Sequence, residues 1–260
     1  MTMYEALTTS GIDSAEAKVL LCFLTGQSRA WLFTHHDQTL DYESERQWTA
    51  ATERRRGGEP LAHILGQKEF YGRIFRSDAR ALIPRSCTES LVDDVKKFFE
   101  NPQDRIQEID PGIVSWTHVL KKETPTVILD IGTGTGCIAI TLAFELPRIR
   151  MIATDVSKEA LNLAKENAEL LGATDRITFL ESDLLQNVIV DERFLIVSNP
   201  PYLAKDSAEL QDGVKEFEPS LALFAEEEGK EIVSRLIVEA KNHPSCVGWV
   251  MECPANFAKP

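Results

Sequence analysis

The chain has 260 residues, of which 43% are hydrophobic and 27% are charged. This usage is ordinary for a globular protein and excludes a wholly disordered or collagen-like chain. The formal net charge of −13 disfavours a protein whose affinity comes mainly from neutralising nucleic-acid phosphates. The length predicts one large or two unequal domains, with a core large enough that no disulfide or metal is needed for stability.

The N-terminal sequence MTMYEALTTSG lacks a basic region followed by an apolar one, and no apolar run approaches the ~20 residues that span a bilayer. We therefore expect a cytoplasmic protein without a membrane anchor. The five cysteines are widely spaced and include no CxxC pair. This pattern predicts free thiols in a reducing compartment, and neither a zinc site nor a disulfide framework.

Residues 1–56 have helical spacing. After Asp13, which suits a helix N-cap, apolar residues recur at i, i+3, i+4 and i+7 until Gly26. Residues 42–56 predict a further helix whose three terminal arginines complement the helix dipole. We expect residues 1–56 to form a small helical domain.

Residues 57–126 are predicted to connect this domain to the rest of the chain. Short apolar alternations between Pro60 and Pro84 predict a β-hairpin, and residues 88–99 regain helical spacing. Residues 101–126 are polar and are interrupted by prolines and a glycine. They are interpreted as a linker or surface excursion.

From residue 127 onward, strand and helix patterns alternate with the regularity of a parallel α/β sheet. The predicted strands cover 127–131, 150–154, 177–180, 194–198 and 247–251. The predicted helices cover 138–145, 158–171 and 232–241. We therefore expect an α/β fold with a doubly wound, mostly parallel sheet within residues 127–260.

A glycine-rich turn follows the first predicted strand, where the backbone can approach a ligand closely. The dinucleotide-binding fingerprint would require a glycine at position 137, where this chain has Cys137. The turn therefore favours a nucleoside ligand other than a dinucleotide. The candidate ligand-binding residues of this turn are Asp130, Gly132, Thr133, Gly134, Thr135 and Gly136.

Acidic residues end the next two predicted strands. Asp155, followed by Val156, can accept both hydrogen bonds of a ribose diol. Asp183 can accept from the exocyclic amine of adenine while Leu184 packs on the base, although Asp183 alone fits a helix cap equally well.

The fourth of these strands ends in Asn199, Pro200, Pro201 and Tyr202, and this is the most specific motif in the chain. Two successive prolines remove two backbone donors and fix φ twice, which predicts a stiff loop. Asn199 and Pro200 supply acceptor oxygens, and Tyr202 supplies a flat ring. These groups suit a planar –NH2, such as that of a carboxamide or an aminopurine.

Together these residues resemble the class I S-adenosylmethionine-dependent methyltransferases of amino groups, in which (D/N/S)PP(Y/F) follows the fourth strand. Other motifs are similar to those of one family among them, the glutamine methyltransferases of peptide-chain release factors (the HemK or PrmC family). These motifs are Gly57-Gly58-Glu59-Pro60, Ile64-Leu65-Gly66, Glu69-Phe70-Tyr71-Gly72, Ile83-Pro84-Arg85 with Thr88-Glu89, and Phe217-Glu218-Pro219 with Ala222-Leu223. The resemblance covers residues 1–252, and the N-terminal helices are similar to the family's substrate-recognition domain.

The resemblance implies methyl transfer from S-adenosylmethionine, which becomes S-adenosylhomocysteine, to the side-chain nitrogen of glutamine in the Gly-Gly-Gln motif of a release factor. No metal is implied. Asn199 and the Pro200 carbonyl would accept the amide N–H bonds, Tyr202 would stack on the amide plane, and Pro201 would complete the substrate loop. The glycine-rich turn, both acidic strand ends and Asn199 would bind the cofactor.

The sequence departs from the family pattern in three places. Ser86 and Cys87 replace a usual Pro-Glu, and the charged segment 224–229 replaces a glycine-rich turn. The chain ends at Pro260, where the family continues into a hairpin, so the sheet is expected to lack its final strands.

An acidic segment, residues 205–231, follows the NPPY loop with three lysines and nine acidic residues. It is interpreted either as a solvated loop or as a surface that steers a basic release factor. The net charge favours a protein substrate without direct nucleic-acid binding. Two alternatives use the same chemistry on another target, namely glutamine methylation of a ribosomal protein and adenine N6 methylation of nucleic acid. An alternative of another class is a non-catalytic S-adenosylmethionine-binding protein.

Overall fold

The computed structural model describes residues 1–204 and 213–258. They divide into two compact units. The first contains residues 1–67 and 213–217, and the second contains residues 68–204 and 218–258. The acidic residues Asp206, Glu209 and Asp212 lie outside the described residues.

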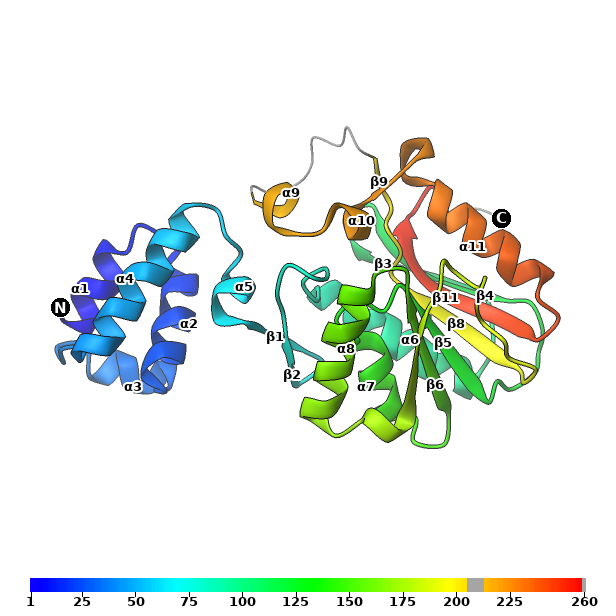
Figure 1. The fold of residues 1–260 in the computed structure, drawn as a ribbon, viewed down its shortest axis with the longest axis horizontal. Helices are drawn as coiled ribbons and strands as arrows, with labels where there is room; N and C mark the ends of the chain where they lie inside the picture. Colours follow the sequence, from blue (N-terminus) through cyan, green and yellow to red (C-terminus); the bar gives the residue numbers. More distant parts are fainter. Residues whose placement is uncertain (205–212, 259–260) are drawn as a thin grey trace. The chain divides into compact units, whose positions relative to one another are not determined.

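The first unit is helical. Its helices are α1 (Met3–Thr9), α2 (Ser14–Thr25), α3 (Arg29–Thr34), α4 (Tyr42–Arg56), α5 (Leu61–Leu65) and α9 (Val214–Phe217) (Figure 1). The predictions of α2 and α4 are confirmed, and Asp13 caps α2 by accepting from the N–H groups of Ala15 and Glu16. The additional helix α1 begins with a capping box, in which Thr2 and Glu5 bond each other's backbone N–H groups.

Apolar side chains from the first four helices form the core of this unit. Leu20, Leu21 and Trp48 are almost fully buried there. Half-buried residues of α5 pack on the same core, so the compact unit extends past residue 56 to Gln67. Burying a side chain of this size contributes about 1.5–3 kcal/mol to the stability of the unit. Because the helices are short, they are stabilised mainly by this packing.

A seven-stranded sheet forms the centre of the second unit, in the order β3-β4-β11-β8-β5-β6-β7. Neighbouring strands from β11 to β7 pair in parallel, whereas β11–β4 and β4–β3 are antiparallel. The strands are β3 (Arg105–Asp110), β4 (Ile113–Val119), β5 (Val127–Ile131), β6 (Arg150–Asp155), β7 (Ile177–Glu181), β8 (Phe194–Ser198) and β11 (Cys246–Pro254). The five strands predicted from residue 127 onward, and the mostly parallel sheet, are therefore confirmed.

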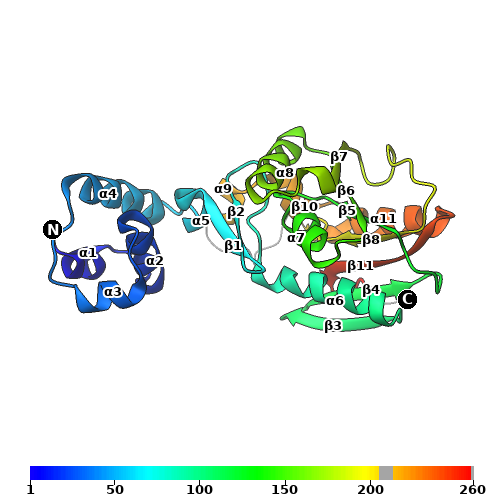
Figure 2. The same ribbon diagram turned by 90° about the horizontal axis from the view of Figure 1, so that it is seen from below.

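The interpretation of residues 101–126 as a linker or surface excursion is wrong. They contain the hairpin of β3 and β4, which lies beside β11 (Figure 2). Pro111 and Gly112, interpreted from sequence as interruptions, form its turn, and Gly112 has the positive φ of 77° that this turn requires. The hairpin gives the sheet seven strands, and β11 is the last strand among the described residues; the expectation that the C-terminal strands are missing stays a prediction.

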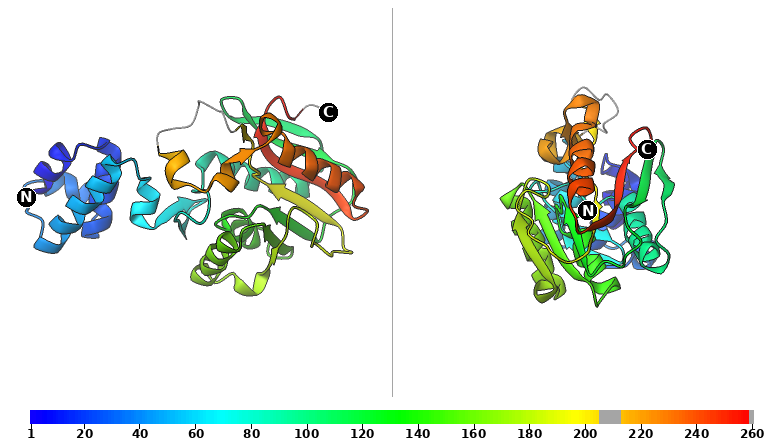
Figure 3. Two further views of the ribbon diagram at one scale, coloured as in Figure 1. Left: turned by 45° about the horizontal axis from the view of Figure 1, so that its top comes forward. Right: turned by 90° about the vertical axis from the view of Figure 1, so that its right-hand side faces the viewer.

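Helices cover both faces of the sheet. They are α6 (Glu89–Glu100), α7 (Cys137–Glu145) and α8 (Lys158–Leu171) on one face and α11 (Glu231–Asn242) on the other (Figure 3). The side chains of β5 alternate accordingly, with Ile128 in the cluster under α6 and α7, and Val127 and Leu129 in the cluster under α11. This double covering explains why every residue of β5 and β8 is buried.

Short elements complete the second unit. They are β1 (Gln67–Phe70), β2 (Arg73–Arg76), η1 (Ser86–Thr88), η2 (Thr174–Arg176), β9 (Leu203–Ala204), α10 (Ser220–Leu223), β10 (Phe224–Ala225) and η3 (Glu227–Gly229). The predicted hairpin is confirmed as β1 and β2, and the departure at Ser86 and Cys87 lies in the 3-10 turn η1. Among the described helices, none combines the length and apolarity needed to cross a membrane.

The acidic segment is not simply a solvated loop. Glu218 has a fully buried side chain, and its two oxygens accept from the Ile83 N–H at 3.0 Å and from Arg85 at 2.7 Å. Glu226, Glu227 and Glu228 are exposed. The described part of this segment therefore combines an exposed acidic turn with a buried structural carboxylate.

Candidate active site

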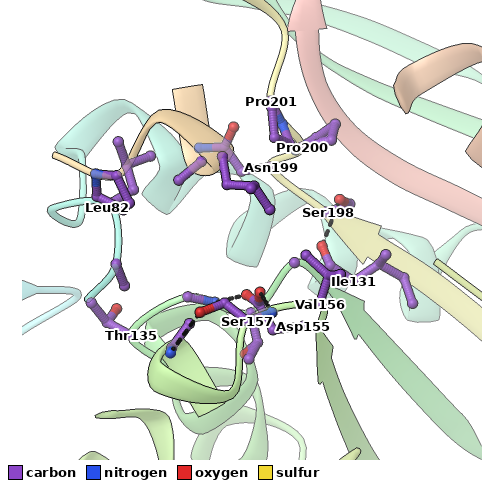
Figure 4. A pocket seen from close by; sticks show the side chains of 18 of the residues that line it. Leu82, Ile131, Thr135, Asp155, Val156, Ser157, Ser198, Asn199, Pro200 and Pro201 are labelled. Atoms are coloured by element: carbon purple, nitrogen blue, oxygen red, sulfur yellow. Dashed lines mark hydrogen bonds between the residues drawn. The ribbon is translucent and has the colours of Figure 1, made fainter. Parts of the chain in front are cut away.

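A cavity of about 240 Å³ lies at the carboxyl ends of the parallel strands in the second unit. Loops after β5, β6, β7 and β8 line it, and residues 80–85 and 219–224 complete its wall. In an open parallel sheet the loops after the carboxyl ends of the strands are where ligands bind. Figure 4 shows this pocket from close by.

The glycine-rich turn after β5 is held by the strand beneath it. Asp130 Oδ2 accepts hydrogen bonds from Thr133 Oγ1 at 2.7 Å and from the Ala139 N–H at 3.1 Å. Gly132 and Gly134 have positive φ angles, of 72° and 56°, which only glycine adopts without strain. The turn therefore keeps a compact backbone with no side chain between its glycines and the cavity.

Asp130 is a buried carboxyl group. Its other oxygen, Oδ1, has no hydrogen-bond partner among the described residues. Burial raises the pKa of Asp130 to about 7, and the bonds from Thr133 and Ala139 act in the opposite direction. Asp130 supports the turn but does not itself line the cavity.

Asp155 joins the end of β6 to the glycine-rich turn. Its carboxylate accepts from the Gly134 N–H at 3.0 Å and from the Ser157 N–H at 2.9 Å. Burial raises the pKa of Asp155 above its usual range. Asp155 and the half-exposed Val156 line the same side of the cavity (Figure 4), so a carboxylate with unused acceptor positions borders the space.

Asp183 and Leu184 follow β7 and also line the cavity. Asp183 pairs with Arg235 of α11 at 2.6 Å and accepts from Gln186 at 3.0 Å. Leu184 has a positive φ of 50°, a conformation that is uncommon for a residue other than glycine. The constrained backbone places both side chains at the pocket, although Asp183 already has a cationic partner.

Residues 199–201 follow β8 and form the opposite wall. Figure 4 shows Asn199 and the two prolines across the pocket from Asp155. Ser198 Oγ donates a 2.7 Å bond to the carbonyl of Ile131, which ties the end of β8 to the end of β5. The acceptor loop and the glycine-rich turn thus belong to one rigid sheet edge.

A buried hydrogen-bond network lies next to Asn199. Asn199 Nδ2 donates to Thr88 Oγ1 at 3.1 Å, and Thr88 Oγ1 donates to Oε2 of Glu252 at 2.7 Å. The Tyr202 hydroxyl donates to the other oxygen of Glu252 at 2.8 Å. Burial raises the pKa of Glu252, and burial together with the Glu252 charge raises the pKa of Tyr202.

Most of the residues predicted from sequence meet at this one cavity. The lining includes Gly132, Thr133, Gly134, Thr135, Asp155, Val156, Asp183, Leu184, Asn199, Pro200 and Pro201. Three others do not line it, namely Asp130, Gly136 and Tyr202. The Tyr202 hydroxyl donates to Glu252, and the expectation that its ring stacks on the substrate stays a prediction.

Several residues of the site were not predicted. The cavity is lined or supported by the loop of residues 80–85, by Thr88 and by the segment after Glu218. Their signal in the sequence is the set of family motifs, which by themselves indicate no role in the site. Glu252 had a weaker signal, because it is an acidic residue near the end of an otherwise apolar strand. Its partner Thr88 is distant in sequence, so that signal could not be interpreted.

Two family models match parts of this chain. Residues 3–66 match the family model described as PrmC N-terminal domain, and residues 106–220 match that of the Methyltransferase small domain. A solved structure, the ribosomal protein L11 methylase of Lactobacillus delbrueckii subsp. bulgaricus, is 29% identical over 45% of each chain, with a TM-score of 0.31.

Curated relatives match over most of the chain. The release factor glutamine methyltransferase of Koribacter versatilis is 39% identical, over 94% of this chain and 80% of its own length. That of Bordetella pertussis is 35% identical, over 89% of this chain and 78% of its own length. This chain therefore belongs to the release factor glutamine methyltransferase family.

Proposed function

We propose that the protein methylates the side-chain amide nitrogen of glutamine in the Gly-Gly-Gln motif of a peptide-chain release factor. One observation carries the proposal. The acceptor groups of residues 199–201 line the same cavity as the glycine-rich turn and Asp155, so a planar –NH2 group and a nucleoside can occupy adjacent positions. Membership of the family supports this choice of substrate.

S-adenosylmethionine is the methyl donor that we propose, and it supplies an electrophilic methyl group on a sulfonium. The residues present fit such a ligand. A Cβ built on Gly132 would meet no atom within 4 Å, so the turn leaves open space. Thr135 lines the cavity, and its buried Oγ1 has no partner among the described residues. We assign Gly132 to Thr135, Asp155 and Asp183 to binding this ligand.

Asn199 and Pro200 are proposed to orient the accepting amide. A carboxamide nitrogen is a poor nucleophile because its lone pair is delocalised into the carbonyl. The Asn199 side-chain oxygen and the Pro200 carbonyl can each accept one N–H bond, which fixes the nitrogen in place and favours the charge that develops on it. We assign no general base, since the proton can leave after transfer.

The helical unit is proposed to recognise the body of the release factor. It exposes large aromatic side chains, with Phe33 and Tyr42 being 84% and 85% exposed, and aromatic residues are enriched in protein interfaces. The net charge of −13 favours a basic protein partner over direct binding of nucleic acid. Release factors act in translation, so we propose that the protein works in the cytoplasm.

The test is methyl transfer from labelled S-adenosylmethionine to purified release factor, to ribosomal proteins and to DNA and RNA. We expect label in the release factor, lost when its Gly-Gly-Gln glutamine is replaced. Label only in a ribosomal protein or in adenine would replace the substrate that we propose. Binding without transfer to any acceptor would instead favour a non-catalytic protein.

A further inference from the structure

The hydrogen bonds around Glu252 leave one orientation for the Asn199 side chain. Glu252 is 1% exposed and Thr88 is 3% exposed, so both are shielded from bulk water. Thr88 Oγ1 lies between them, 2.7 Å from Glu252 Oε2 and 3.1 Å from Asn199 Nδ2.

The direction of each hydrogen bond in this network follows from which groups can donate a proton. A carboxylate only accepts hydrogen bonds, whereas a hydroxyl has one proton to donate and lone pairs with which to accept. Because Thr88 gives its proton to Glu252, it faces Asn199 as an acceptor. Asn199 must therefore present its NH2 to Thr88, which turns its Oδ1 away from Thr88.

The reverse orientation of the Asn199 amide is disfavoured. It would place Oδ1 against Thr88 Oγ1 with no proton between the two oxygens. Leaving such buried groups unpaired shifts an equilibrium by about tenfold to a hundredfold. The Tyr202 hydroxyl occupies the other oxygen of Glu252, so the same carboxylate holds both ends of the loop from 199 to 202.

We infer that Glu252 is a positioning residue for methyl transfer, which acts through Thr88 and through its own contact with the Asn199 side chain to present Asn199 Oδ1 to the accepting –NH2 group. The inference rests on the proposed function, in which this oxygen accepts an amide N–H. Glu252 belongs to β11 and does not line the cavity, whereas Thr88 and Asn199 do. Its effect on the substrate is therefore indirect.

The decisive variant is Glu252→Gln, which keeps the size of the side chain but introduces an NH2 donor. The amide of a glutamine can donate to Thr88 Oγ1, which frees the Thr88 proton to point at Asn199 and removes the preference for one orientation. We expect kcat to fall by about tenfold to a hundredfold. The Kd for S-adenosylmethionine and the KM for release factor should change less than threefold.

Variants of Thr88 test whether Glu252 acts on Asn199 through the Thr88 hydroxyl. Thr88→Val removes the hydroxyl and should lower kcat, by less than Glu252→Gln because the contact of Glu252 with the Asn199 side chain remains, whereas Thr88→Ser should restore most of that loss. Combining Thr88→Val with Glu252→Gln should cost little more than Glu252→Gln alone, because both act on one orientation. Thr141→Val is the matched control, since Thr141 is a buried threonine outside the cavity whose Oγ1 has no partner among the described residues. It should leave kcat unchanged.

A measurement without substrate separates this inference from the proposed function. The side-chain amide resonances of Asn199, assigned by their loss in Asn199→Ala, should shift in both Glu252→Gln and Thr88→Val and stay in place in Thr141→Val. Resonances unchanged in the first two variants would overturn the inference, as would fully additive losses of kcat. If the parent protein methylates no release factor, the proposed function fails, and the resonances alone then decide the inference.

Discussion

The backbone N–H of Gly134 donates a 3.0 Å hydrogen bond to the carboxylate of Asp155. This bond joins the loop after β5 to the end of the neighbouring strand β6. One carboxylate therefore shapes the glycine-rich turn and also borders the cavity. A change at Asp155 should affect ligand binding through both roles.

Asp155→Ala is expected to weaken binding of S-adenosylmethionine by about 1.5–3 kcal/mol, the range for hydrogen bonds to a charged group. Isothermal titration calorimetry measures this change directly. Asp175→Ala is the control, because Asp175 is exposed and outside the cavity. This variant should bind S-adenosylmethionine as tightly as the parent does. Equal affinity in Asp155→Ala would remove Asp155 from the site.

Asn199→Ala should reduce turnover by about 10² or more, because it deletes one preorganised polar contact to the reacting group. Cofactor affinity and the free energy of unfolding should change much less than turnover. Single-turnover transfer to release factor measures the chemical step. Asn162→Ala, on the exposed face of α8, is the matched control. A parent-like rate in Asn199→Ala would contradict the proposed mechanism.

Gly136→Ala should destabilise the fold more than Gly172→Ala. Both glycines have positive φ, 80° and 74°, so both variants carry a left-handed backbone cost of about 1–2 kcal/mol. Only the Cβ at Gly136 would meet neighbours, at 3.0 Å from Ile140 and 3.1 Å from Ala164. This crowding adds about 1–3 kcal/mol. Urea denaturation measures the difference, and equal losses would show that the site relaxes freely.

Asp130→Asn should stabilise the protein increasingly as the pH rises. Burial raises the folded-state pKa of Asp130 to about 7 from 3.8, so the folded state holds the proton more tightly and stability is lost as the pH rises through this range. Asparagine does not titrate. The gain in unfolding free energy should therefore be about 3 kcal/mol larger at pH 8 than at pH 5, measured without cofactor. The same gain at both pH values would show that Asp130 does not titrate with a raised pKa.

Folded release factor should be a much better substrate than a short Gly-Gly-Gln peptide. The glutamine between two glycines enters the cavity in either case, but only the factor offers a surface for the helical unit. Raising salt from ~50 to ~300 mM should slow methylation of the factor, because it shortens the Debye length. Equal kcat/KM for both substrates, without a salt effect, would show that neither the helical unit nor net charge selects the substrate.

The glycine-rich turn and its flanking elements were predictable because their signals are local. A run of apolar residues entering a GTGTG sequence predicts a buried strand, a tight turn and a helix, and β5 and α7 lie within one residue of the predicted bounds. Alternation of such units predicts a parallel sheet whose carboxyl ends meet at one edge. The location of the candidate site followed from this rule alone.

The β3–β4 hairpin was not predictable in the same way. Its outer strand β3 is mostly exposed, so its composition is that of a linker. What makes it part of the sheet is the pairing of β4 with β11, and β11 lies far along the chain. A segment's own residues cannot show whether such a partner strand is available.

The sequence by itself determined the family, the parallel sheet and the loops that border the cavity, because periodicity, glycine turns and motifs report local backbone conformation. Only the tertiary structure decided which side chains complete those loops. Thr88 and Glu252 are separated by 164 positions, and Ile83 and Glu218 by 135. Hydrogen bonds at such separations depend on how strands and helices pack, and local sequence patterns carry no information about that packing.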